Sequence, residues 1–295
     1  MNQHSIQNNH LQVVVASRGA ELQSISDRQR QTEYLWQGEE RYWADRSPLL
    51  FPIIGRLRNG VYSCDGNTFS MELHGFIKDQ VFQSTTITGD RIVLQTESTP
   101  ETMQQYPFAF RFLVEYVLVD ASLVISFQIE NTGDRPMPFS LGTHPGFRVP
   151  LADGERFEDY SLCFEQEEYP HKVELDGVFI AGKTSIFPLV SNRILPLRHG
   201  LFDQEAIILG GIQKKFISLI DPSGTVCWSL DFADFDYLTL WQPPQTDAPF
   251  VCLECWNGLP DPACAKSNAL DQKPGTRILA PGTTTQASVK ILFTP

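Results

Sequence analysis

The amino-acid sequence predicts an all-β protein, organised as a sandwich of two large, twisted antiparallel sheets. Three observations point to this fold class. Short apolar and β-branched segments recur along the whole chain, turn-forming residues separate them, and a helical spacing of apolar residues is almost absent. Strands of this spacing suit a sandwich, in which one concave face can carry a groove lined by inward-pointing side chains.

The expected strands follow one another through short turn sequences. The breaks between them are rich in Gly, Asp, Pro and Ser, which tolerate turn dihedral angles, so hairpins are the expected connections. One short helix is expected over residues 100–106, because the ring of Pro107 blocks its continuation. In chain order, the expected strands cover residues 11–15, 20–25, 61–64, 81–88, 91–97, 110–119, 123–131, 216–220, 226–232, 237–241 and 286–293.

The chain is expected to form a single domain over residues 1–295. Its length fits one large sandwich, and it contains neither an internal repeat nor a low-complexity linker. We interpret the stretch 149–196 as long loops at the end of the sheets rather than as a domain boundary. Hydrophobic residues make up 42% of the chain and aromatic residues 11%, which is enough for one extended core.

Charge and cysteine content exclude several classes of partner. The 23 basic and 35 acidic side chains give a net charge of −12, which repels phosphate backbones and anionic lipids. We therefore expect neither a nucleic acid nor a membrane as a partner. The polar N-terminus lacks the features of a secretory signal, and six cysteines without such a signal are typical of reduced thiols. The expected location is the cytoplasm.

Four charged or titratable residues interrupt otherwise apolar or Gly/Pro-rich segments. They are Arg56, His74, His144 and Glu254. Burying such a group is costly unless it is paired or used, so one shared polar cleft explains them more economically than four separate buried groups. Taken singly, each has a structural alternative: a histidine can satisfy a turn, Arg56 can cap a loop, and Glu254 can pair with a buried arginine.

The segments around these four residues resemble ordered motifs of the aldose 1-epimerase family, in particular its LacX-like branch. The resemblance covers nearly the whole chain, and four motifs in the same order are far more specific than one. It implies a β-supersandwich of the galactose mutarotase type and an enzyme that needs neither a metal nor a cofactor. The motifs are Phe51-Pro52-Ile53-Ile54-Gly55-Arg56-Leu57, Leu73-His74-Gly75-Phe76, Gly142-Thr143-His144-Pro145-Gly146-Phe147 and Pro249-Phe250-Val251-Cys252-Leu253-Glu254-Cys255-Trp256.

The resemblance also implies a role for each of the four residues. The residue matching His144 is the general acid at the ring oxygen of a hexose, and Glu254 is the base at the anomeric hydroxyl. Ring opening, rotation of the C1 end and closure then interconvert the α and β anomers of a monosaccharide. Arg56 and His74 are expected to hydrogen-bond the sugar and orient it. A histidine with an ordinary pKa of about 6.5 and a glutamate of about 4.3 suit these roles near neutrality.

Two positions depart from the family pattern. Where the family places a sugar-binding aspartate in a Phe-x-x-Asp-Ala context, this chain has Glu205, and the nearby Asp203 is an alternative source of the carboxylate. Thr143 stands where a second glycine is common. Trp241 is a candidate apolar wall for one face of the sugar, with a core role as the alternative.

Other chemistries find less support in the sequence. The two histidines and Glu254 lack the local spacing of a zinc site, so no metal is expected. Cys252 and Cys255 form a Cys-x-x-Cys, but on a strand their thiols face opposite sides, which favours packing over redox chemistry. There is no phosphate-binding loop or serine-hydrolase elbow.

Several functional alternatives on the same scaffold stay open. One is a carbohydrate-binding protein without catalysis, which retention of both His144 and Glu254 disfavours. Another is a hexose-6-phosphate mutarotase, for which Arg56 and Arg58 are thin evidence. A glycoside hydrolase needs a second catalytic carboxylate opposite Glu254 and ranks last. The identity of the hexose stays open, as does the choice between monomer and homodimer.

Overall fold

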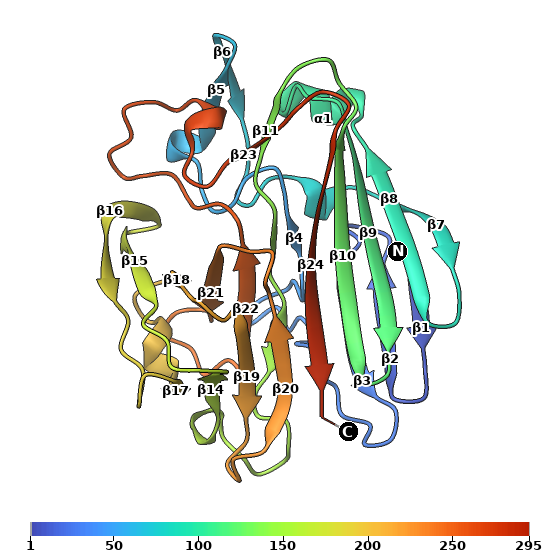
Figure 1. Ribbon diagram of the computed structural model, residues 1–295, viewed down its shortest axis with the longest axis vertical. Helices are drawn as coiled ribbons and strands as arrows, with labels where there is room; N and C mark the ends of the chain where they lie inside the picture. The colour runs from blue at the N-terminus through green and yellow to red at the C-terminus, as the bar shows by residue number, and fades with distance from the viewer. Residues whose placement is uncertain (1, 295) are drawn as a thin grey trace.

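The computed structural model describes residues 2–294 and consists almost entirely of antiparallel strands (Figure 1). The all-β prediction is confirmed. Two large sheets dominate. The nine-stranded sheet runs, in spatial order, through β17 (Ile194–Pro196), β14 (Ser161–Phe164), β19 (Phe216–Ile220), β20 (Val226–Asp231), β24 (Thr284–Phe293), β10 (Ser122–Asn131), β9 (Phe110–Val119), β8 (Arg91–Glu97) and β7 (Gln83–Ile87).

The eight-stranded sheet carries Trp241 and Glu254 on its strands and His144 between β12 (Gly142–Thr143) and β13 (Gly146–Arg148). Its strand β13 pairs with β22 beside the main path. That path runs through β16 (Phe179–Ile186), β15 (His171–Asp176), β18 (Ile207–Gly210), β21 (Tyr237–Trp241), β22 (Phe250–Trp256), β12 (Gly142–Thr143) and β4 (Leu49–Leu50).

Smaller elements complete the fold. The strands β1 (Gln3–Gln7), β2 (Leu11–Ala16) and β3 (Leu22–Asp27) form a third sheet, and two ribbons pair β5 (Val61–Cys64) with β6 (Asn67–Ser70) and β11 (Met137–Phe139) with β23 (Arg277–Leu279). The helix α1 (Pro100–Gln105) begins at its cap Thr99 and ends before Pro107. Short 3₁₀ helices cover Arg58–Gly60, Ile77–Asp79, Phe157–Asp159 (η3), His199–Phe202 (η4) and Leu270–Gln272. No helix within residues 2–294 is long and apolar enough to span a membrane.

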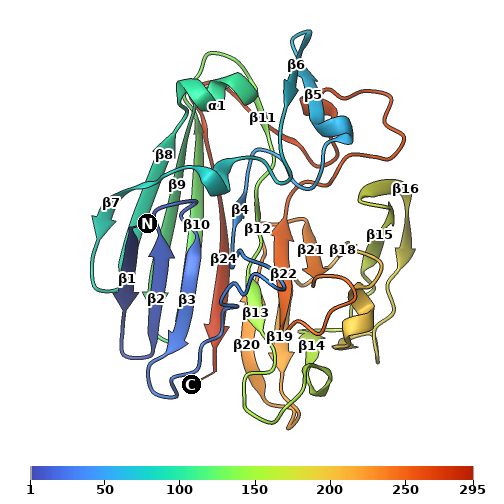
Figure 2. The ribbon, with the colours of Figure 1, turned by 180° about the vertical axis from the view of Figure 1, so that it is seen from behind.

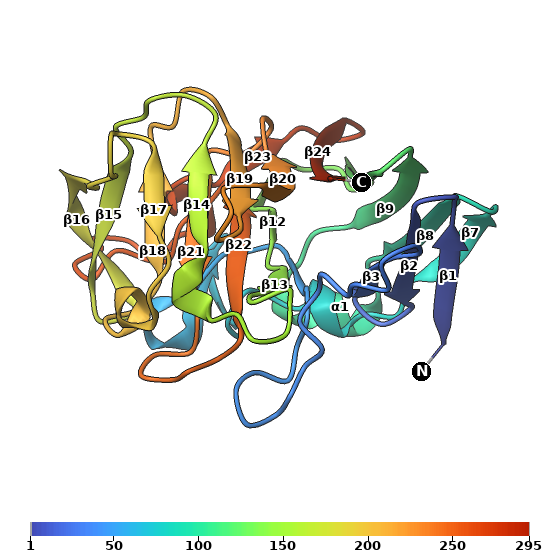
Figure 3. The same ribbon diagram turned by 90° about the horizontal axis from the view of Figure 1, so that it is seen from below.

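The nine-stranded sheet forms one layer, and the other two sheets lie side by side against it (Figures 2 and 3). The β1–β3 sheet covers the β7–β10 end, where the Tyr116 hydroxyl donates to the carbonyl of Ala20 over 2.6 Å. The eight-stranded sheet covers the other end, where Phe147 stacks on Trp228 with ring centroids 4.2 Å apart. One large apolar core fills the space between the layers.

Alternation along the strands explains which face each side chain takes. On β9 and β10, buried and half-buried residues alternate over the full length, as expected for strands with one face on a core. Strand β22 is buried at every position. Its residues Val251, Leu253 and Cys255 belong to the main core, whereas Cys252 belongs to a separate apolar cluster on the other face. The two thiols therefore face opposite sides.

All the strands expected from the sequence are present, with ends that differ by a few residues. The interpretation of residues 149–196 as loops is wrong, because β14, β15, β16 and β17 lie there and extend both large sheets. Strands β14 and β17 have only four and three residues, and β16 leaves most of its residues exposed. Their alternation of apolar and polar residues is therefore too weak to stand out in the sequence.

Candidate active site

A cavity of about 590 Å³ lies on the face of the eight-stranded sheet that points away from the main core. This volume falls in the range of small-molecule sites. The structure brings to this cavity every residue singled out from the sequence except Asp203. Those residues are Arg56, His74, His144, Glu205, Trp241 and Glu254.

The register of the sheet places His144 opposite Glu254. Gly142 pairs with Trp256, and Gly146 pairs with Cys252. His144 is midway between the two glycines and Glu254 is midway between their partners, so the two residues face each other. Side chains at opposite positions of antiparallel segments point to the same face and touch. His144 Nε2 lies 3.2 Å from Glu254 Oε2.

Glu254 is buried in an apolar setting, with 1% of its surface exposed. The indole Nε1–H of Trp256 donates to Glu254 Oε2 over 3.1 Å. Burial raises the pKa of Glu254 well above its usual range, and the single hydrogen bond from Trp256 opposes this only weakly. The carboxyl group is therefore held more strongly in its protonated form than an exposed glutamate is.

His144 is also buried, and its imidazole is surrounded by aromatic rings. Its centroid lies 4.9 Å from that of Trp43 and 5.6 Å from that of Trp241. Burial lowers the pKa of His144 below its usual value. Within residues 2–294, its Nδ1 atom has no hydrogen-bond partner. Buried polar atoms without partners are expected where a polar ligand binds.

The two shifts together describe a pair that holds one proton. Burial disfavours both the imidazolium and the carboxylate, so the neutral imidazole next to the protonated carboxyl is favoured. Moving that proton from Oε2 to Nε2 creates the ion pair without changing the total charge of the site. Such a pair titrates as a unit and can both donate and accept a proton.

His74 reaches the cavity from a turn with left-handed backbone geometry, at φ 65°. Its Nδ1 accepts a hydrogen bond from the backbone N–H of Gly55 over 3.1 Å, which leaves the proton of the neutral ring on Nε2. Burial lowers the pKa of His74 well below its usual range, and the neighbouring His144 acts in the same direction. The neutral ring therefore offers Nε2–H as a donor.

Arg56 lies exposed at the cavity edge, on a loop that buried residues hold in place. Its carbonyl accepts from the backbone N–H of Asp261 over 3.1 Å, and the carboxylate of Asp261 accepts from the N–H of Arg58 over 2.7 Å. Lys273 forms a buried ion pair with Asp261. Arg58 itself does not line the cavity; its guanidinium lies 3.5 Å from the carbonyl of Ala263.

The two alternative carboxylates have different places. Glu205 lines the cavity, and its backbone has φ 111°, a conformation that residues with a side chain rarely adopt. Asp203 is exposed and accepts a hydrogen bond from the backbone N–H of Gln245 over 3.2 Å. Strained backbone conformations persist where the surroundings require them, often at functional sites. Of the two carboxylates, Glu205 is the one at the cavity.

Two features of the site were not expected from the sequence: Trp43 packs on His144, and Trp256 donates a hydrogen bond to Glu254. Trp43 lies in the polar segment 37–46, where a large aromatic residue on a loop was a usable signal for a binding role. Trp256 closes the motif around Glu254. Among the described residues, no group of three His, Cys, Asp or Glu side chains is arranged to hold a metal ion.

Comparison with known proteins agrees with this geometry. The chain belongs to the aldose 1-epimerase family, whose model matches residues 2–291. It is 31% identical to the chromosomal LacX protein of Lactococcus lactis subsp. lactis, over 97% of each chain. The resemblance inferred from the four motifs is confirmed.

Solved structures share the whole fold. A galactose mutarotase related enzyme from Lactobacillus acidophilus superposes with a TM-score of 0.94 at 30% identity, covering 100% of this chain and 98% of that one. A galactose mutarotase-like protein from Lactobacillus casei gives 0.93 at 31% identity, covering 99% and 100%. The fold is therefore the expected galactose mutarotase-like β-supersandwich.

Proposed function

We propose that the protein is a mutarotase that interconverts the α and β anomers of a neutral hexose. The observation that carries this proposal is the contact of His144 Nε2 with Glu254 Oε2, two buried side chains 3.2 Å apart at the cavity. A pair that shares one proton matches a reaction in which one proton leaves the sugar and another is returned. Membership of the aldose 1-epimerase family supports the same chemistry.

The proposed reaction is balanced without any co-reactant. With the shared proton on His144, the Glu254 carboxylate takes the proton of the anomeric hydroxyl as a carbonyl forms at C1. His144 gives its proton to the ring oxygen, and the bond between C1 and that oxygen breaks. Rotation about the bond between C1 and C2 presents the other face of the aldehyde, and the reverse steps close the ring. Hydrogen bonds from sugar hydroxyls favour the carboxylate that burial alone disfavours.

The other cavity residues bind and orient the sugar in this proposal. His74 donates from Nε2, and Arg56 donates from the edge of the cavity. Glu205 accepts from sugar hydroxyls in place of the family aspartate, because Asp203 is turned to the hairpin loop instead. Trp241 and Trp43 form the apolar walls that an aliphatic face of a sugar ring contacts.

The charges at the cavity favour a neutral sugar over a hexose phosphate. Lys78 is 3.2 Å from Asp79, so its charge is already compensated. Within the described residues, Arg56 has no carboxylate partner, and a single arginine falls short of the cluster that a phosphate requires. Three further acidic side chains line the same cavity and repel a dianion: Asp45, Glu72 and Glu205.

The test is polarimetry of freshly dissolved α-glucose and α-galactose in a weakly catalytic buffer. We expect the wild-type protein to accelerate mutarotation, and Glu254→Gln and His144→Asn each to abolish the acceleration. If neither free sugar responds, hexose 6-phosphates are measured next. Sugar binding without acceleration of any of these substrates would make the protein a carbohydrate-binding protein and overturn the proposal.

We further infer that the protein works in the cytoplasm as a single domain. All six cysteines are free thiols, which fits a reducing compartment. A mass measurement in solution decides between monomer and homodimer. Detection of the protein in separated cell fractions tests the location.

A further inference from the structure

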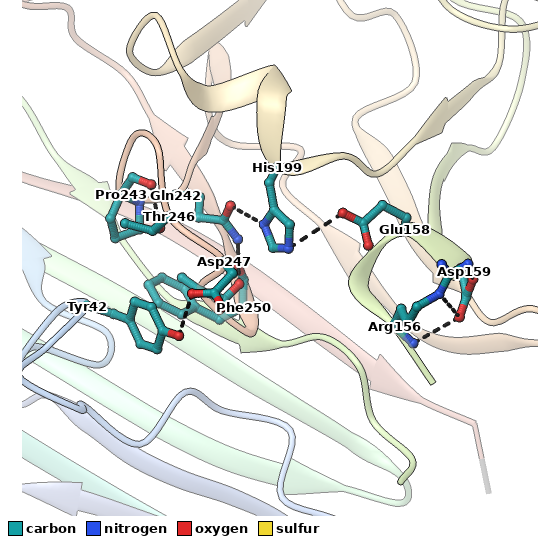
Figure 4. Close-up of polar contacts among 11 residues, drawn as sticks. Tyr42, Arg156, Glu158, Asp159, His199, Gln242, Pro243, Thr246, Asp247 and Phe250 are labelled. Carbon is teal, nitrogen blue, oxygen red and sulfur yellow. Dashed lines mark hydrogen bonds and ion pairs between the residues drawn. The ribbon is translucent and has the colours of Figure 1, made fainter. Parts of the chain in front are cut away.

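Three segments that line the sugar cavity are tied together behind its wall by a group of polar side chains (Figure 4). The first is the loop 242–249, which joins β21 to β22 and follows Trp241. The second is the stretch from η4 to β18, which carries Glu205. The third is the loop 37–46, which carries Trp43. None of the linking side chains belongs to the proposed catalytic pair.

Gln242 lies at the centre of this group and is fully buried, with 0% of its surface exposed. Its side-chain nitrogen donates to the carbonyls of Ala248 and Phe250 over 2.6 and 2.7 Å. These two bonds close the hairpin loop directly behind Trp241. The side-chain oxygen of Gln242 lies 2.8 Å from Nδ1 of His199 on η4.

The hydrogen-bonding partners decide where the proton on His199 sits. Backbone carbonyls only accept, so the amide of Gln242 must point its nitrogen at them and its oxygen at His199. Nδ1 of His199 is therefore the donor. Because Gln242 can offer only an acceptor here and His199 must supply the donor, the link depends on both side chains.

The surroundings of His199 hold its ring in place. The ring stacks on Phe157 with centroids 4.4 Å apart and an interplanar angle of 16°. Its Nε2 lies 3.6 Å from the carboxylate of Glu158 on η3. The pKa of the Asp247 carboxyl is lowered mainly by its hydrogen bond with Tyr42, and His199 acts in the same direction. The nearby Arg156 is engaged by Asp159, over 2.8 Å. The charged groups that face His199 are thus both acidic.

Two further bonds extend the link to the other segments. The carboxylate of Asp203 accepts from the backbone N–H of Gln245, which ties the Glu205 segment to the hairpin loop. The hydroxyl of Tyr42 donates to Asp247 over 2.7 Å, which ties in the loop that carries Trp43. These three cavity-lining segments therefore meet at the hairpin loop.

We propose that His199 and Gln242 are positioning residues that set the sugar-binding wall formed by Trp241 and the Glu205 segment. This inference rests on the proposed function. The loop 242–249 contains no strand, and the buried amide of Gln242 supplies two of the hydrogen bonds that hold it closed. The donor at His199 Nδ1 fixes that amide and joins the loop to the segment of Glu205. Neither side chain lines the cavity.

The kinetic test compares two substitutions of His199. His199→Phe keeps a ring on Phe157 but removes the donor to Gln242, and His199→Asn places an amide donor near the position of Nδ1. We expect the phenylalanine variant to raise KM for the hexose about two- to tenfold, the effect of one lost hydrogen bond, with kcat within about twofold. We expect the asparagine variant to restore most of the wild-type KM. A general loss of folded protein lowers the apparent kcat and leaves KM unchanged. The ratio of the two effects therefore distinguishes a lost positioning role from simple unfolding.

Hydrogen exchange of the protein without sugar supplies a second readout. In His199→Phe, amides of residues 242–249 should exchange faster than in the wild type, while those of β9 and β10 stay unchanged. Unchanged exchange of the loop, or an unchanged KM, overturns the positioning role. A wild-type protein without mutarotase activity, combined with faster loop exchange in His199→Phe, contradicts the proposed function alone. In that case, the affinity for the sugar, measured by tryptophan fluorescence, replaces KM. We expect His199→Phe to bind the sugar more weakly than the wild type and His199→Asn to restore most of the affinity.

Discussion

His144 and Glu254 occupy opposite positions on two antiparallel segments of one sheet, and His144 Nε2 lies 3.2 Å from Glu254 Oε2. The pairing joins residues from distant parts of the chain on the cavity side of the eight-stranded sheet. Burial lowers the pKa of the first and raises that of the second. Burial thus favours the neutral imidazole beside the protonated carboxyl, so we expect the pair to hold one proton, and this expectation has measurable consequences.

The first prediction concerns the pH dependence of mutarotation. At a pH below the lowered pKa of His144, the pair binds a second proton and no group is left to act as the base. At a pH above the raised pKa of Glu254, the pair loses its only proton and no group is left to act as the acid. We therefore expect kcat/KM to be flat across the ordinary histidine value of about 6.5. The profile is measured by polarimetry from pH 5 to 9. An acid limb centred near pH 6.5 contradicts the shared-proton description.

The second prediction separates activity from stability at Glu254. Glu254→Gln should lower kcat by at least about 10²-fold, the typical contribution of a positioned base. Its unfolding free energy should rise relative to the wild type. A carboxyl with a raised pKa in the folded state loses stability as pH rises above its unfolded value of about 4.3. The gain from glutamine should therefore grow between pH 5 and 8, measured by urea denaturation. A stability gain that shrinks as the pH rises contradicts a raised pKa of Glu254.

The third prediction concerns the tryptophan that covers His144. Trp43→Ala admits water to the imidazole, which relieves the burial that lowers its pKa. We expect the acid limb of the kcat/KM profile to move up towards the ordinary histidine value and KM to rise. Trp43→Phe keeps an aromatic ring and serves as the matched control, with a smaller change in both quantities. An unchanged acid limb in Trp43→Ala indicates that other residues exclude water from His144.

The fourth prediction distinguishes Glu205 from Asp203. Glycine adopts φ 111° without strain, so Glu205→Gly should leave the melting temperature unchanged or raise stability by about 1 kcal/mol. The same substitution should raise KM for the hexose, because it removes a carboxylate from the cavity. Asp203→Asn keeps an acceptor for the Gln245 amide and should leave KM unchanged. A larger KM effect at Asp203 reverses the assignment of the sugar-binding carboxylate.

The fifth prediction concerns the buried ion pair that supports the Arg56 loop. Asp261→Ala leaves the ammonium of Lys273 buried without a partner and should destabilise the protein by about 3–5 kcal/mol. Replacing both residues, Asp261→Leu with Lys273→Met, should recover part of that loss. Unfolding in urea measures both variants. Equal destabilisation by the single and double changes indicates that the hydrogen bond from the Arg58 amide matters more than the charge pair.

Much of the fold follows from patterns that are local in the sequence. Along β9 and β10 every second residue is buried, and almost all of these buried residues are apolar; a turn at Asp120 joins the two strands. The middle of the chain behaves differently. Strands β15 and β16 lie at the edge of their sheet and expose polar residues, so neighbouring strands rather than local pattern define them.

The sequence by itself determined the all-β class, the family and the residue types at the candidate site, because turn chemistry, alternation and the four motifs are all local. Tertiary structure alone decided three things: that His144 faces Glu254, that Glu205 rather than Asp203 reaches the cavity, and that Trp43 covers the imidazole. Each depends on the register between distant strands or on the path of a loop. Register is set by the packing of the whole sheet, and a shift of one residue turns every side chain to the opposite face.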